Sequence, residues 1–194
     1  MKFFSKTNLY FLLLLCSALF CGCSFAQEKG HYNSAELRRE NERTVSLTLY
    51  LNLPQVLHQV LAPKLSIGDF LKNYSELSDN QLDKEISKAS SILTARTYFI
   101  LPSGSKVNFK KWQFPSSQAV RESFKLSILL ILLPAVVQGQ NHLDPVKVAS
   151  EAQSKSSLNT IQLQLPSEFH PILVKVQNDT FWMTEQIPTA LVNF

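Results

Sequence analysis

Residues 44–52 read TVSLTLYLN, and large apolar side chains alternate strictly with polar ones along them. Successive side chains of an extended chain point to opposite faces, so this period of two predicts a β-strand with one face in a core. The core face would carry only branched apolar side chains, namely Val45, Leu47, Leu49 and Leu51.

Three short amphipathic patterns follow and predict helices between about residues 54 and 96. Pro54 suits the first turn of the first helix, which ends before Pro63. Ser66 and Ser78 open the other two, and each has a side chain three residues later that fits a capping box. Because these helices are grouped and do not alternate with strands, the pattern favours α+β over a doubly wound fold.

The remaining chain is predicted to be mostly β-strand, with turn residues between the strands. We therefore expect an α+β fold: an antiparallel β-sandwich or curled sheet, with a short helical segment inserted after the first strand. The predicted strands are residues 97–101, 106–112, 124–133, 145–151, 159–165, 171–176, 180–183 and 190–194.

Residues 124–133 (FKLSILLILL) are predicted to form a central strand buried on both faces. A membrane helix is the rival interpretation, which the short run, Lys125 and Pro134 disfavour. This assignment predicts that seven side chains in the central strands are buried: Leu126, Ile128, Leu130, Leu132, Ile161, Leu163 and Leu165.

The first 26 residues have the pattern of a secretory signal. Two lysines precede an apolar run at residues 9–20, and small residues follow. Cleavage after Ala26 would leave a mature chain that starts at Gln27. Residues 27–43 are polar and predict a flexible tether. Residues 44–194 then form a single β-rich domain, located in the periplasm or the outer envelope.

A second interpretation of the signal ends it at residue 22. Residues 20–23 (FCGC) resemble a bacterial lipobox, in which Cys23 would carry a lipid. That anchor would be the protein's only contact with a membrane. The three cysteines all lie in the signal, so the domain after it has neither a disulfide nor a thiol nucleophile.

The charge balance excludes nucleic acid as a partner. The whole chain has a formal net charge of +4, but without Lys2 and Lys6 the 17 remaining basic residues face 15 acidic ones. A net charge this close to zero does not indicate a positively charged surface that would attract a polyanion.

Catalytic and cofactor motifs are missing from the sequence. It has no glycine-rich phosphate loop, no Gly-x-Ser-x-Gly and no His-Glu-x-x-His, so no cofactor is expected. A metal site is conceivable because His142 and Asp144 are two residues apart and His170 starts a predicted strand. This site would make the protein a metal-binding carrier or a metal-dependent hydrolase. The alternative is a turn whose polar groups satisfy the local backbone.

Residues 106–114 (KVNFKKWQF) mix lysines with aromatic side chains. In a strand, Lys110, Trp112 and Phe114 share one face, which makes them candidates for a partner surface. The alternative is that Val107 and Phe109 are core residues and that the lysines protect an edge strand. Taken together, the signal, the β-rich pattern and the missing motifs predict an exported, non-enzymatic binding or accessory module that meets another envelope protein.

Overall fold

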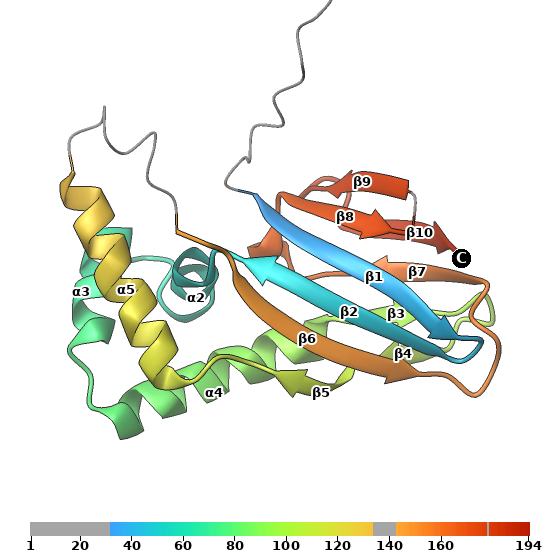
Figure 1. The fold of residues 1–194 in the computed structure, drawn as a ribbon, viewed down its shortest axis with the longest axis horizontal. Coiled ribbons are helices and arrows are strands. Elements are labelled where there is room, and N and C mark those ends of the chain that lie inside the picture. Colours follow the sequence, from blue (N-terminus) through green and yellow to red (C-terminus); the bar gives the residue numbers. More distant parts are fainter. Residues whose placement is uncertain (1–31, 134–142, 178) are drawn as a thin grey trace, which may run out of the picture. The chain divides into compact units, whose positions relative to one another are not determined.

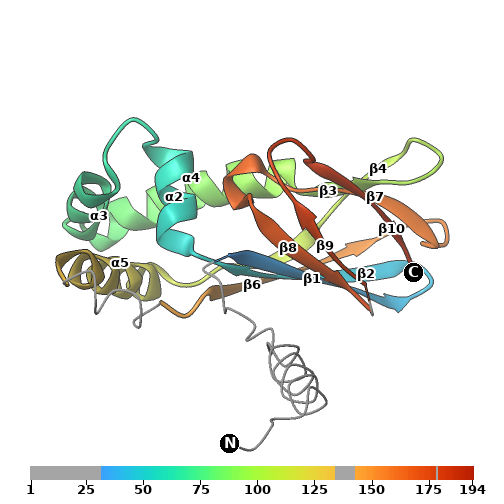
Figure 2. The ribbon, with the colours of Figure 1, turned by 90° about the horizontal axis from the view of Figure 1, so that it is seen from above.

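The computed structural model describes residues 32–133, 143–177 and 179–194. The signal with Cys23, and also His142, lie outside the described residues. The described chain is mixed α+β, with two sheets and four helices. The helices gather at one end of the sheets, as Figures 1 and 2 show.

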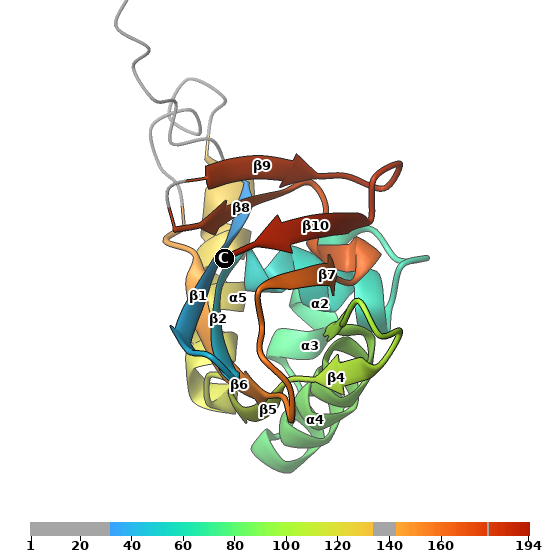
Figure 3. The ribbon, with the colours of Figure 1, turned by 90° about the vertical axis from the view of Figure 1, so that its right-hand side faces the viewer.

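The larger sheet has six strands and the smaller has four (Figure 3). Among the described pairings, β1 with β8 is parallel and every other pair is antiparallel. The six-stranded sheet runs in the order β5 (Lys110–Gln113), β6 (Val146–Gln153), β2 (Thr44–Leu51), β1 (Asn33–Asn41), β8 (Ile172–Val176) and β9 (Asp179–Met183). The four-stranded sheet runs β10 (Thr189–Asn193), β7 (Thr160–Gln164), β3 (Tyr98–Ile100) and β4 (Lys106–Asn108).

The strand predicted at residues 44–52 is confirmed as β2. All four of its apolar side chains are completely buried, while its polar residues are only partly covered. They belong to one core cluster that draws on both sheets and also includes Ile161 and Leu163 of β7. The predicted burial of these two residues and of Leu165 is also confirmed.

The three predicted helices are confirmed as α2 (Leu53–Leu61), α3 (Ile67–Ser75) and α4 (Asp79–Arg96). Ser66 caps α3 by accepting a hydrogen bond from the backbone N–H of Asp69 at 3.1 Å. Ser78 and Gln81 form the capping box that starts α4. These helices surround a second apolar cluster, to which Phe70 and Leu82 belong.

The strand predicted at residues 124–133 is wrong, because residues 124–132 belong to helix α5 (Ser117–Leu132) and Leu133 is its C-cap. Ser116 caps the helix by accepting a hydrogen bond from the backbone N–H of Ala119 at 3.3 Å. Val120, Phe124 and Ser127 are buried at helical spacing. Of the four residues of this stretch that were predicted to be buried, Leu126 and Leu132 are exposed, and Ile128 and Leu130 are only partly buried. A short apolar run fits a buried strand and a helix equally well, so its periodicity alone did not separate them.

The flexible tether predicted for residues 27–43 is also wrong over most of its length, because β1 (Asn33–Asn41) lies between β2 and β8. Ala35 and Leu37 reach the core, and polar residues occupy the rest of the strand. Backbone hydrogen bonds to strands on both sides hold such a segment in place even though it has few large apolar side chains.

Arg121 joins helix α5 to two other helices, α3 and α4. Its guanidinium donates to the carbonyl oxygen of Ser75, at the end of α3, and to Oδ1 of Asp79, at the start of α4. The beginning of α5 therefore lies beside the end of α3, so the two helices are antiparallel. Within the described residues, no helix has the length and apolar character needed to cross a membrane.

Candidate functional site

From Phe124 onward, helix α5 carries apolar residues both on the side that packs in the helical core and on the side that faces solvent. On the inner side, Phe124 is completely buried and meets Phe70 edge-to-face, with ring centroids 5.5 Å apart. On the outer side, the exposed fractions are 51% for Leu126, 59% for Leu129 and 75% for Leu132. An amphipathic surface helix normally carries polar residues on its outer side. Leu126, Leu129 and Leu132 are three residues apart along α5, so their exposed side chains follow one another along the helix.

Two further apolar residues lie close to this end of α5. Because α3 and α5 are antiparallel, the first residues of α3 lie beside the second half of α5. Leu65 and Ile67 are there, with exposed fractions of 40% and 38%. We call five of these exposed residues the α5 apolar surface: Leu65, Ile67, Leu126, Leu129 and Leu132. Ile131 of the same helix is 49% exposed as well.

Lysines flank the α5 apolar surface. Lys64 precedes Leu65, and Lys125 precedes Leu126 and lies one turn before Leu129. Both are exposed, and neither forms a salt bridge within the described part of the chain. Two acidic residues also lie nearby: Asp69 accepts a hydrogen bond from the hydroxyl of Ser66, and Glu122 accepts one from the amide of Gln118. The rim of this surface therefore carries side chains of both charges.

The structure describes two of the three residues of the candidate metal site. His142 lies outside the described residues, Asp144 is exposed just before β6, and His170 is buried. Among the residues that the structure describes, no three His, Cys, Asp or Glu side chains cluster in a way that could hold a metal ion.

His170 is a buried histidine whose ring lacks hydrogen-bond partners among the described residues. Its side chain is 8% exposed, and neither ring nitrogen has a hydrogen-bond partner. Burial lowers the pKa of His170 from its ordinary value of 6.5, although the charges of Glu185 and Glu168 oppose the shift. The Glu168 carboxylate is itself paired with Arg96 at 2.6 Å. Burial of the imidazole therefore favours its neutral form.

The aromatic residues of the candidate partner surface are engaged with the core. Trp112 and Phe114 are partly buried, stack with ring centroids 5.7 Å apart, and pack against the main core. The indole Nε1 of Trp112 donates to the carbonyl oxygen of Phe109 at 3.1 Å. Lys110 is exposed on edge strand β5. This arrangement leaves little of the aromatic pair for a partner.

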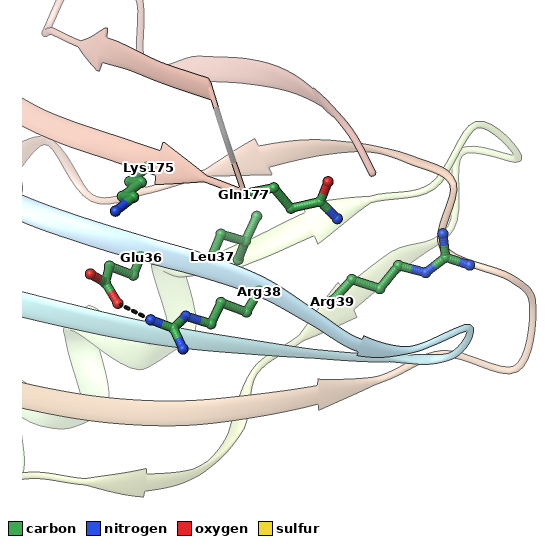
Figure 4. A pocket seen from close by; sticks show the side chains of 6 residues that line it. All are labelled: Glu36, Leu37, Arg38, Arg39, Lys175 and Gln177. Atoms are coloured by element: carbon green, nitrogen blue, oxygen red, sulfur yellow. Dashed lines mark hydrogen bonds and ion pairs between the residues drawn. The ribbon is translucent and has the colours of Figure 1, made fainter.

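A charged hollow of about 310 Å³ lies beside the end of β8, where β1 continues past its neighbour (Figure 4). Arg38 pairs with Glu36 at 3.0 Å, and Nε of Arg39 donates to the carbonyl oxygen of Asn41. Leu37, Lys175 and Gln177 complete the lining. Both arginines already have partners within β1.

Sequence reasoning missed both the hollow and the α5 apolar surface. The hollow was missed because residues 27–43 were assigned to a tether, although Ala35 and Leu37 alternate with polar residues there. The α5 apolar surface was missed because its leucines were assigned to a buried strand. The serine at position 116, a good helix N-cap, was the local signal for a helix.

Comparison with known proteins provides no relative: no family model, no curated protein and no solved structure matches this chain.

Proposed function

We propose that this protein is an exported, non-enzymatic binding or accessory module of the cell envelope, and that the α5 apolar surface is where it meets its partner. The single observation that carries this proposal is the exposure of Leu126, Leu129 and Leu132 on a helix whose other side packs in the helical core. Leaving large apolar side chains in water is unfavourable, so a row of them is explained by a partner that covers it.

The rest of the chain supports the same proposal. The signal pattern of residues 1–26 supports export to the periplasm or outer envelope. The two sheets share one apolar core, which supports a sandwich that serves as a rigid scaffold for the helical end. The alternative function, a metal-binding carrier or hydrolase, lacks such support, because the described residues contain no cluster of three metal-ligating side chains.

Photo-crosslinking in the native host tests this proposal. A photoreactive residue replaces Leu129 in the full chain, and a matched chain carries it at Ser87 on the exposed side of α4. We expect a defined adduct from position 129 and none from position 87. Equal adduct patterns from both positions would contradict a contact surface on α5. Intact-mass measurement of the exported protein then establishes whether it begins at Gln27 or at a lipidated Cys23.

A further inference from the structure

We draw no further inference here: the strongest candidate, the exposed outer face of helix α5, belongs to the surface already described, and nothing in the described part of the chain shows what covers it.

Discussion

The backbone N–H of Asn52 donates a hydrogen bond of 2.7 Å to Oδ1 of Asn33. The same side chain donates from Nδ2 to the carbonyl oxygen of Phe169 at 2.8 Å. One amide therefore joins the first residue of β1, the start of α2 and the turn before β8. Asn33 lies in the segment whose sequence suggested a flexible tether, yet it connects three distant parts of the chain.

Replacing this amide should destabilise the domain. We expect Asn33→Ala to lower the free energy of unfolding by about 1–3 kcal/mol, because it leaves a partly buried N–H and a carbonyl oxygen without their partner. Urea unfolding followed by circular dichroism measures the change. Asn73→Ala, at an exposed position on α3, is the matched control and should have little effect. Equal stabilities of the two variants would show that the Asn33 contacts contribute nothing.

Two leucines predicted to be buried from the sequence should respond differently to truncation. Leu163→Ala should cost about 2–5 kcal/mol, since Leu163 is completely buried in the main core. Leu126→Ala should cost less than about 0.5 kcal/mol, since this side chain is half exposed on α5. Thermal melts of the two variants beside the parent provide the comparison. A large loss for Leu126→Ala would mean that α5 is buried in the folded protein.

His170 should make stability depend on pH. Burial holds the pKa of His170 below 6.5 in the folded protein, against the opposing charges of Glu185 and Glu168. As pH falls below 6.5, the unfolded chain therefore binds a proton more readily than the folded one. The contribution of the neutral imidazole is fully present above this value and is lost as pH falls through the folded pKa.

Unfolding free energies of the parent and of His170→Phe, measured across this pH range, test that expectation. The apolar ring of the variant has no proton to gain, so its unfolding free energy should fall less steeply as pH is lowered. Near pH 8, where histidine is neutral in both states, the two proteins should differ only by a constant offset, about the cost of the changed packing. A variant that keeps the full pH dependence of the parent would assign that dependence to other groups.

Metal removal should leave the domain folded. A structural metal contributes folding energy directly, so a chelator would then lower the melting midpoint. We expect no change in the midpoint, because the described residues hold no cluster of metal-ligating side chains. A drop of many degrees would contradict this, and His142, Asp144 and His170 would be the first residues to mutate. Elemental analysis of protein purified without a histidine tag would detect a weakly held metal that the melt misses.

Local signals in the sequence were sufficient for β2 and for helices α2 to α4. The alternation of residues 44–52 can place its leucines on one face only as a strand, and Ser66 and Ser78 start helices through hydrogen bonds within one turn. Both kinds of signal depend on neighbours a few residues away, so they can be recognised before any long-range contact is known.

Long-range contacts decided the secondary structure of β1 and α5, and with it the position of the α5 apolar surface. Residues 33–41 have too few large apolar side chains to predict a central strand, and they become one because β2 and β8 pair with both of their edges. Residues 124–133 are apolar enough for either a buried strand or a helix, and packing against α3 makes them a helix with leucines facing outward. A pattern of apolar residues predicts which side chains leave water, but the elements that cover them come from distant parts of the chain.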